Sequence, residues 1–434
     1  MIDILLQNNV ILIKKYMLIT RIKAGNFYGI KDPIEVVFTE GGEKEKIGYV
    51  NVGKERISLI SGFYGANASG KSTILNVIDT IIRIMLSKQQ EFIIDPNGIK
   101  QEIVISLPNY NTDMQSKPTV MEMDFVINEI KYSYLISLVN EGKEISEEVL
   151  YKNNNKIFSR SNHNISFEAD IEKKIGAVAK NIVAPKKSSF LSVVLDDSSD
   201  ISVFGNIKEE IGISELKEIK NKICFITDKR SVQIGQNNIQ GIFALAVNYI
   251  NNINIDSSIK KLNDVNSIVK YFEPSFKKLN IQKKDQNSIE YTAQYNNFYK
   301  DLPVIELSAG TREIISYISD ILRILKTGGI IVYDETSKYY HPDMEIAILN
   351  LFKDTDINKN NAQIFFSSHN HETFDLLQND QAYVLEKRDG NITVNKVSDF
   401  DVKERDNIKR VYRLGSLGGV PDTIDFNRII NNLL

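Results

Sequence analysis

The sequence contains a single cysteine, Cys224, in 434 residues. One thiol excludes an internal disulfide, and the apolar run around it, KICFIT, favours a buried thiol in a reducing compartment. We therefore expect a cytoplasmic protein. The sequence also lacks the run of about 18 apolar residues that a membrane-spanning helix requires, so no membrane partner is expected.

An excess of charge of one sign is also absent. Lys and Arg number 53 against 56 Asp and Glu, which gives a net charge of −3. This balance argues against a uniformly basic nucleic-acid-binding protein, although it leaves a local basic patch open. The chain shows no sustained heptad pattern and no repeat of fixed period, which argues against a long coiled coil.

The hydrophobic pattern divides the chain into four parts. Residues 1–16 are interpreted as an N-terminal extension, because Asn8 and Asn9 interrupt the apolar core that a targeting peptide needs. Residues 17–160 predict a lobe with antiparallel strands, and residues 161–300 a mainly helical inserted lobe. Residues 301–434 return to an α/β pattern. The predicted fold class is therefore α/β, with a mixed sheet core, an antiparallel β subdomain and an inserted helical lobe.

The stretch GANASGKS, residues 65–72, fits the pattern G-x-x-x-x-G-K-[ST] between an apolar run and a helical pattern. Glycines permit backbone angles and a close approach that a Cβ would block. N–H groups at a helix start attract phosphate, the lysine reaches the β- and γ-phosphates, and the serine hydroxyl binds Mg²⁺. The bland alternative is a chance glycine-rich turn, which the strand–loop–helix context disfavours. The predicted nucleotide-binding residues are Gly65, Ala66, Asn67, Ala68, Ser69, Gly70, Lys71, Ser72 and Thr73.

The run IIVYDE, residues 330–335, delivers two carboxylates to the end of a buried strand. Beside a phosphate-binding loop this pattern predicts that Asp334 binds Mg²⁺ and that Glu335 polarises the attacking water. The metal-binding residues are thus predicted to be Ser72 and Asp334. Taken alone, a strand ending in Asp-Glu is often a solvated turn.

Two further stretches predict contacts with phosphate. ELSAGTRE, residues 306–313, places Ser308 and Gly310 at a second helix start. Two such starts on one chain cannot easily face one nucleotide, which favours two chains arranged head to tail. His369 follows the apolar strand QIFFSSHN, where a neutral imidazole could contact the γ-phosphate. An ordinary capped helix and an ordinary core histidine are the alternatives. We predict Lys71, Glu335 and His369 as the catalytic residues.

The order of these motifs resembles that of the ABC-type ATPases, whose signature LSGGQ is similar to LSAGT with Ala309 and Thr311 as departures. The hairpin NFYGIK resembles the RecF/SMC/OLD branch, and GANASGKST, PTVMEMDF, ISEEVLY and YRLGSLGGVP resemble its AAA15-type ATPases. The resemblance covers most of residues 17–425 and is loose across 160–300. It implies an ATP hydrolase that uses ATP and Mg²⁺, with the Asn26–Ile30 hairpin near the base and ribose. TSKYYHP, after the acidic pair, lacks the usual small residues, and Gln115 is a weak candidate for the Q-loop glutamine.

The same resemblance implies partners. Related ATPases include RloA, the AbiL-like ATPases and the AriA subunit of PARIS, the ATPase halves of anti-phage defence pairs. It implies a homodimer or a larger homo-oligomer through the ATP sites, a separate toxic effector such as a Toprim-like nuclease, and a phage-encoded trigger. A RecF-like DNA-repair ATPase is the alternative, with Lys186–Lys187, Lys229–Arg230 and the run from Lys403 to Arg413 as basic candidates. A transporter subunit fits less well, because the segment between Ser72 and the signature is longer than a transporter's helical lobe needs.

Overall fold

The computed structural model describes residues 16–41, 46–86, 92–94, 100–102, 105–176, 182–196, 207, 209, 211–226, 255–283, 289–336, 341–402, 407–420, 430–431 and 433. The expected N-terminal extension lies outside the described residues except for Tyr16. The first strand begins at Met17, as the alternating pattern predicted. The Lys229–Arg230 pair also lies outside the described residues, as do residues 403–406.

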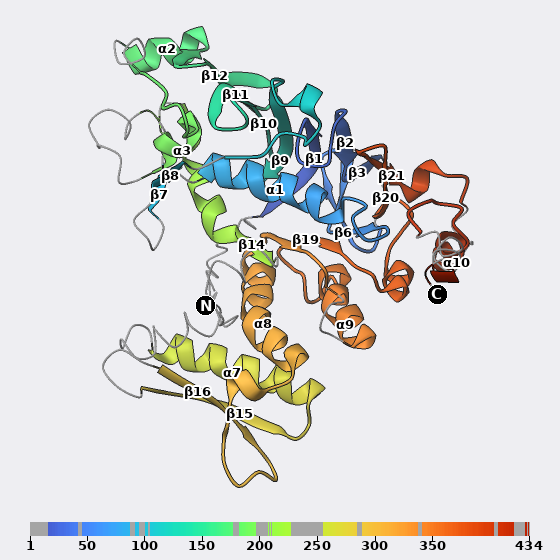
Figure 1. The fold of residues 1–434 in the computed structure, drawn as a ribbon. Helices are drawn as coiled ribbons and strands as arrows, with labels where there is room; N and C mark the ends of the chain where they lie inside the picture. The colour runs from blue at the N-terminus through green and yellow to red at the C-terminus, as the bar shows by residue number, and fades with distance from the viewer. Residues whose placement is uncertain are drawn as a thin grey trace, which may run out of the picture.

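A six-stranded sheet forms the centre of the molecule (Figure 1). Its strands pair in parallel, except for the antiparallel pair at the β20–β21 edge. The spatial order is β14 (Ile223–Ile226), β18 (Ile330–Tyr333), β19 (Gln363–Ser367), β6 (Ile60–Tyr64), β20 (Ala382–Arg388) and β21 (Asn391–Lys396). Strand β19 thus lies between β6, which leads to the glycine loop, and β18, which leads to the two carboxylates.

Alternate residues of these strands pack into two hydrophobic cores, as the two-residue period of a strand requires. Val332 and Phe365 face the core that contains helix α1 (Lys71–Leu86). Ile331 and Phe366 face the core that contains α8 (Ala309–Thr327) and α9 (Pro342–Lys353). Because both faces are covered, the strands read as continuous apolar runs.

A seven-stranded antiparallel sheet covers the other side of α1 (Figure 1). Helix α1 is therefore buried around most of its circumference, which fixes its N-terminal lysine. In spatial order the strands are β13 (Asn164–Phe167), β12 (Asn155–Ser161), β11 (Glu144–Lys152), β10 (Ile130–Val139), β9 (Thr119–Ile127), β1 (Met17–Gly25) and β2 (Ile34–Val37). The mixed core and the antiparallel subdomain confirm the predicted fold class.

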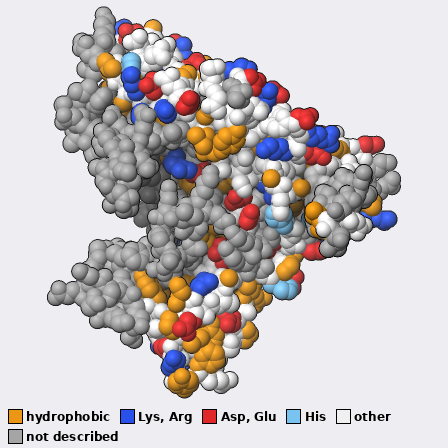
Figure 2. Space-filling model, in the orientation of Figure 1, with side chains coloured by type: hydrophobic (Ala, Val, Ile, Leu, Met, Phe, Trp, Pro, Cys, Tyr) orange, Lys and Arg blue, Asp and Glu red, His pale blue; other side chains and the backbone are white. Residues whose placement is uncertain are grey.

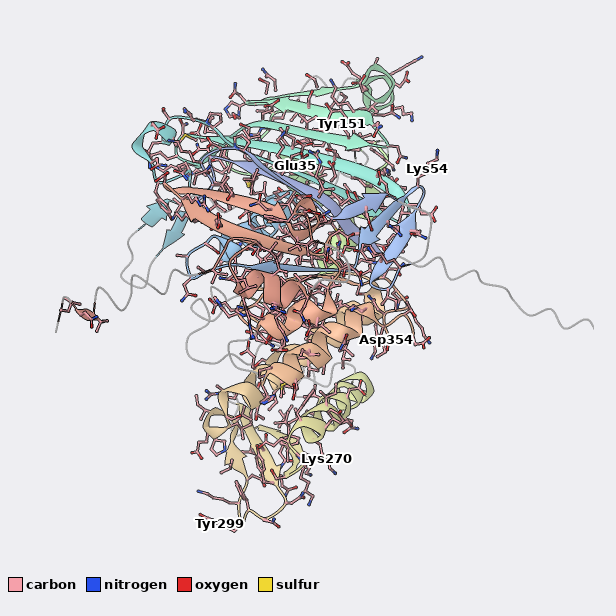
Figure 3. All side chains as sticks on the ribbon, turned by 90° about the vertical axis from the view of Figure 1, so that its right-hand side faces the viewer. Glu35, Lys54, Tyr151, Lys270, Tyr299 and Asp354 are labelled. Carbon is pink, nitrogen blue, oxygen red and sulfur yellow. The ribbon has the colours of Figure 1, made fainter. Side chains whose placement is uncertain are left out.

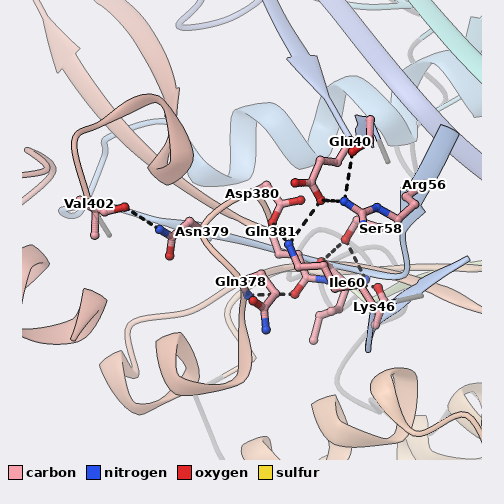
Figure 4. Close-up of polar contacts among 12 residues, drawn as sticks. Glu40, Lys46, Arg56, Ser58, Ile60, Gln378, Asn379, Asp380, Gln381 and Val402 are labelled. Carbon is pink, nitrogen blue, oxygen red and sulfur yellow. Dashed lines mark hydrogen bonds and ion pairs between the residues drawn. The ribbon is translucent and has the colours of Figure 1, made fainter. Parts of the chain in front are cut away.

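A polar cluster joins the small sheet to the loop before β20 (Figure 4). The small sheet contains β3 (Thr39–Gly41), β4 (Tyr49–Val52) and β5 (Glu55–Ser58). Glu40 accepts hydrogen bonds from Arg56 at 2.9 Å and from Lys46 at 3.3 Å. Lys46 also lies 3.3 Å from Asp380, and Gln381 Nε2 donates to the Gly48 carbonyl at 3.1 Å. These contacts tie the N-terminal hairpins to the strand that borders the glycine loop.

The described part of residues 161–300, where a mainly helical lobe was expected, contains both helices and strands. Strand β14 of this segment pairs with β18 in the central sheet, and a further three-stranded sheet lies against helix α7. ICFI is a short apolar run beside β18, and in FKKLNIQK the residues after the irregularity at Phe276–Lys278 alternate apolar and polar with a strand period. The elements of this second sheet and its helix are α7 (Ile255–Phe272), β15 (Phe276–Lys283), β16 (Ile289–Tyr295) and β17 (Leu302–Pro303).

The second sheet and α7 form a projecting lobe, opposite the antiparallel sheet (Figure 3). In that view Tyr299 and Lys270 mark the lobe, and Tyr151 on β11 marks the far end of the molecule. Figure 2 shows hydrophobic side chains gathered over this lobe, where Tyr271 and Tyr299 are 80% and 93% exposed. The remaining elements are β7 (Phe92–Ile94), β8 (Lys100–Glu102), α2 (Ala169–Ile175), α3 (Phe190–Leu195), α10 (Ile408–Arg413) and several 3-10 turns.

Candidate nucleotide-binding site

The glycine loop joins β6 to α1, as the sequence predicted. Gly65 and Gly70 have φ angles of +154° and +109°. A Cβ on Gly65 would lie 2.6 Å from the Leu385 carbonyl oxygen, and one on Gly70 would overlap Ile392. The loop therefore fits against β20 and β21 only with glycine at both positions.

Lys71 is held inside the loop. Its side chain donates to the carbonyls of Gly65 at 2.9 Å and Ala66 at 3.0 Å. Burial lowers the pKa of the lysine, and the carboxylates of Asp334 and Glu335 oppose that shift. A phosphate group would replace the neutral carbonyls with charged acceptors, which form stronger hydrogen bonds to an ammonium.

The two carboxylates stand directly after β18, and Ser367 at the end of β19 connects them. Its hydroxyl donates to Asp334 Oδ1 at 2.5 Å and accepts from the Glu335 N–H at 2.7 Å. Glu335 has a φ of +56°, a left-handed conformation that costs about 1–2 kcal/mol for a residue with a Cβ. Sequence reasoning did not identify Ser367, although the serine pair before His369 was the available signal.

A buried carboxylate, Glu345 on α9, organises the loops behind these strands. It accepts hydrogen bonds from Thr336, which follows Glu335, and from Asn370 Nδ2 at 2.9 Å. Burial raises the pKa of Glu345, and the hydrogen bonds to its oxygens oppose that shift. The segment after Thr336, residues 337–340, lies outside the described residues, so the structure says nothing of the altered TSKYYHP stretch there.

His369 lines the same cavity as the glycine loop. Burial lowers its pKa, the positive charge of Lys71 lowers it further, and the nearby carboxylates act in the opposite direction. A lowered pKa favours the neutral imidazole that the sequence interpretation assumed. His341, by contrast, caps α9 by accepting the Asp343 N–H at 3.3 Å.

A cavity of about 460 Å³ brings these groups together. Tyr28 and Gly29 from the turn after β1 lie on its wall, which agrees with the expected position of the Asn26–Ile30 hairpin. Tyr110 faces Tyr28 edge-on, with ring centroids 6.4 Å apart, and neither Tyr110 nor Lys387 was singled out from the sequence. Gln115 is not among the lining residues, which are Tyr28, Gly29, Asn67, Ala68, Gly70, Lys71, Ser72, Thr73, Tyr110, Glu335, His369, Lys387 and Ile392.

Ser308 and Gly310 do not line this cavity. Ser308 is the N-cap of α8, where its hydroxyl accepts the Thr311 N–H at 3.1 Å. The structure therefore brings together the loop, the acidic pair and His369 within one chain. It leaves the second helix start elsewhere on the exposed surface.

The donor set suits a nucleotide with Mg²⁺. The Ser69 hydroxyl is buried in the loop without a hydrogen-bond partner among the described residues. Ser72 is exposed and lines the cavity together with Glu335, whereas Asp334 is not among the lining residues. No cluster of three or more His, Cys, Asp or Glu side chains suited to a metal is present in the described part of the chain.

The C-terminal turn lies against the glycine loop. Gly419 donates its N–H to Glu386 at 2.9 Å, and its carbonyl accepts the Tyr412 hydroxyl at 3.0 Å. A Cβ on Gly419 would lie 3.4 Å from the Gly65 Cα atom. The stretch LGSLGGVP, known from the sequence only as a resemblance, thus supports the loop from outside.

Fold and site together define a P-loop ATPase head of the ABC type, with the phosphate loop after β6, the acidic pair after β18 and the parallel strand β19 between them. The sequence profile of the AAA_21 family, an AAA-domain family described with the AbiEii toxin and type IV toxin–antitoxin systems, matches residues 60–375. The chain therefore belongs to this family. No protein of curated function matches it significantly in sequence.

A structural comparison matches the chain to several solved SMC head domains. A head bound to the C-terminal winged-helix domain of ScpA is 12% identical, with 87% of this chain and 97% of that chain covered and a TM-score of 0.44. A head from Pyrococcus yayanosii with a coiled coil and joint is 10% identical, with 92% and 100% covered and a TM-score of 0.42. The Thermotoga maritima head is 10% identical, with 87% and 98% covered and a TM-score of 0.37.

Among the described residues of the present chain, no helix is long and apolar enough to span a bilayer.

Proposed function

We propose that the chain binds ATP with Mg²⁺ in the cavity and hydrolyses it. The supporting observation is the convergence of the loop, Glu335 and His369 on one 460 Å³ cavity at the ends of parallel strands. In this proposal Lys71 binds the β- and γ-phosphates, and Ser72 and Asp334 hold the metal. Mg²⁺ would neutralise charge on the phosphates during transfer.

In the same proposal Glu335 accepts a proton from the attacking water, because its carboxylate lines the cavity beside the lysine. Ser367 fixes the backbone of Glu335 through the 2.7 Å hydrogen bond, which limits where that carboxylate can point. A neutral His369 can donate to or accept from a phosphate oxygen or the water. A positioned general base contributes about 10²- to 10⁴-fold to the rate.

We propose further that a second copy completes the site. Ser308 is exposed at the start of a 19-residue helix, and the cavity of its own chain does not include it. A helix start of this length carries partial positive charge that favours phosphate. Two copies arranged head to tail would place each Ser308 and Gly310 on the ATP bound by the other.

The test combines two substitutions with measurements of turnover and association. Lys71→Ala should abolish ATP binding, and Glu335→Gln should bind ATP, lower turnover by at least about 100-fold and stabilise the ATP-bound assembly. Phosphate release and light scattering with and without Mg-ATP measure the two effects. The matched controls are Lys54→Ala and Glu141→Gln, which change exposed turn residues that do not line the cavity. Full turnover in both site variants would contradict the proposal.

The biological role that we propose is control of a separate toxic effector in cytoplasmic anti-phage defence. One observation supports it: the family is described with a toxin and type IV toxin–antitoxin systems. The chain would then hold or release an effector, such as a nuclease, in response to a phage-encoded trigger. Co-purification of the product of the adjacent gene, with the wild type and with Lys71→Ala and Glu335→Gln, tests this role. Effector binding and toxicity that ignore both substitutions would exclude regulation by ATP.

A further inference from the structure

The start of α8 is connected to the projecting lobe by a short series of hydrogen bonds. Ser308 Oγ lies 2.7 Å from Thr311 Oγ1, and Thr311 Oγ1 donates to Glu273 Oε2 at 2.8 Å. Thr311 is one of the two residues at which the signature departs from LSGGQ, and it is 8% exposed. Glu273 directly follows α7, so it belongs to the lobe and not to the signature.

Acceptor chemistry fixes the direction of the protons in this series. An ionised carboxylate only accepts, so the Thr311 hydroxyl must donate to Glu273. The Ser308 hydroxyl must then donate to Thr311 Oγ1, while Ser308 Oγ also accepts the Thr311 N–H at 3.1 Å. Two hydrogen bonds from one residue therefore define the side-chain rotamer of Ser308.

The other side of Glu273 is anchored in the lobe. Its N–H donates to the Val269 carbonyl at 2.8 Å, and its carbonyl accepts the Phe276 N–H at 2.9 Å. Burial, and secondarily the hydrogen bond and charge of Glu273, raise the pKa of the Tyr295 hydroxyl on β16. Helix α7 also packs on α8 through one shared hydrophobic core. The carboxylate thus lies where the helix, the second sheet and the signature meet.

We propose that Glu273 is a positioning residue for Ser308, acting through the Thr311 hydroxyl, and that it couples the projecting lobe to ATP-dependent association. The inference rests on the proposed function, because it assumes that Ser308 contacts the ATP of a second copy. Without Glu273 the Thr311 hydroxyl is free to donate to Ser308 instead, which reverses the proton direction and leaves the serine rotamer less defined. Movement of α7 relative to α8 would have the same effect.

Two effects of Glu273 oppose each other, and substitutions separate them. Its hydrogen bond orients the series, whereas its negative charge repels an incoming phosphate. Glu273→Gln retains an acceptor oxygen and removes the charge. Glu273→Ala removes both. Positioning predicts that alanine weakens association while glutamine leaves it unchanged or tighter. A purely electrostatic effect predicts that both variants tighten association.

The experiment measures ATP-dependent association by sedimentation in the Glu335→Gln background. Glu273→Ala should weaken association about 3- to 10-fold, the value of one hydrogen bond. Thr311→Val should weaken association by the same factor. Thr311→Ser and Glu273→Gln should preserve association. The double variant Glu273→Ala/Thr311→Val should associate no more weakly than Thr311→Val alone. The control is Asp264→Ala on α7, whose carboxylate lies 3.7 Å from Lys326. In dilute protein, where a single copy binds ATP, the variants should have the same ATP affinity as this control. Their midpoints of thermal unfolding should also equal that of the control.

Each result supports or overturns the inference. Wild-type association in both alanine and valine variants overturns it, and so does tighter association in Glu273→Ala. Additive losses in the double variant overturn the series as a unit. Ser308→Ala separates this inference from the proposed function: if that substitution leaves association unchanged, the proposed two-copy site fails. If Ser308→Ala weakens association and Glu273→Ala does not, only the role of Glu273 fails.

Discussion

The contact between the C-terminal turn and the glycine loop predicts a specific defect for Gly419→Ala. Gly419 has a φ of +70°, and a Cβ there would lie 2.6 Å from Val384 Cγ1, 3.1 Å from the Leu385 carbonyl oxygen and 3.4 Å from the Gly65 Cα atom. The same Leu385 carbonyl lies 2.6 Å from the position of a Cβ on Gly65. An added methyl group therefore pushes on the backbone that holds the phosphate loop.

Gly415→Ala provides a control for the backbone contribution alone. Gly415 has a φ of +77°, and a Cβ there would meet nothing within 4 Å. A left-handed alanine costs about 1–2 kcal/mol, and one methyl group forced into a packed site adds about 1–3 kcal/mol. Gly415→Ala should therefore lose about 1–2 kcal/mol of unfolding free energy. Gly419→Ala should lose about 2–5 kcal/mol.

Only the substitution at Gly419 should also weaken ATP binding, because only its methyl group bears on the loop. Denaturant unfolding with and without Mg-ATP measures the stability of both variants, and titration with a fluorescent ATP analogue measures affinity. The stabilisation that ATP adds should be smaller in Gly419→Ala than in Gly415→Ala. Equal unfolding free energies and equal ATP affinities in the two variants would refute the reasoning.

Two further predictions concern buried polar groups. Gln363 is fully buried and makes hydrogen bonds to the Ile19 N–H at 2.8 Å, the Ile19 carbonyl at 3.0 Å and the Ser58 carbonyl at 2.8 Å. Gln363→Ala should therefore lower the unfolding free energy by about 3 kcal/mol or more, and a loss under 1 kcal/mol in denaturant titrations would contradict this account. Burial, and then the charge of Arg413, lower the pKa of His371 from 6.5. The unfolded chain therefore binds this proton at a higher pH than the folded chain does. The free energy of unfolding should fall as the pH is lowered below 6.5. Arg413→Gln should raise the pKa of His371 toward 6.5 and reduce that loss, as NMR titration and pH-dependent unfolding can show; an unchanged pKa would exclude the role of Arg413.

The parts of the fold that depend on a local pattern could be predicted. The glycine loop is confirmed between a strand and a helix, because strand burial, glycine spacing and helical periodicity all lie within residues 60–86. The strands before Asp334 and His369 are confirmed for the same reason. Asn153 and Asn154 form the turn between β11 and β12, with φ angles of +48° and +67°, because asparagine tolerates the left-handed region. In each case the physical cause lies within a few residues.

The parts that depend on distant contacts could not be predicted. The role of Ser367 requires the order of β18 and β19 in the sheet, which no window of sequence contains. Glu273 lies 38 positions from its partner Thr311. Gly419 meets a loop far earlier in the chain, and residues 161–300 read as helical although β14 belongs to the central sheet. Side-chain patterns specify which elements form, whereas their neighbours follow from how the two cores fill.

The left-handed backbone at Glu335 suggests different roles for the two parts of the proposed site. One part contains Lys71, Glu335 and His369, and the other contains Ser308. A left-handed glutamate persists only where its surroundings hold it, and here the N–H bond to Ser367 and the Thr336–Glu345 contact do so. Lys71 at the start of α1, and Glu335 and His369 just after β18 and β19, are thus held by elements of the central core. Ser308 is different, because its position depends on a helix end and on a separate lobe. Regulation should therefore act on the Ser308 side, where a small displacement changes association without disturbing the residues proposed for chemistry.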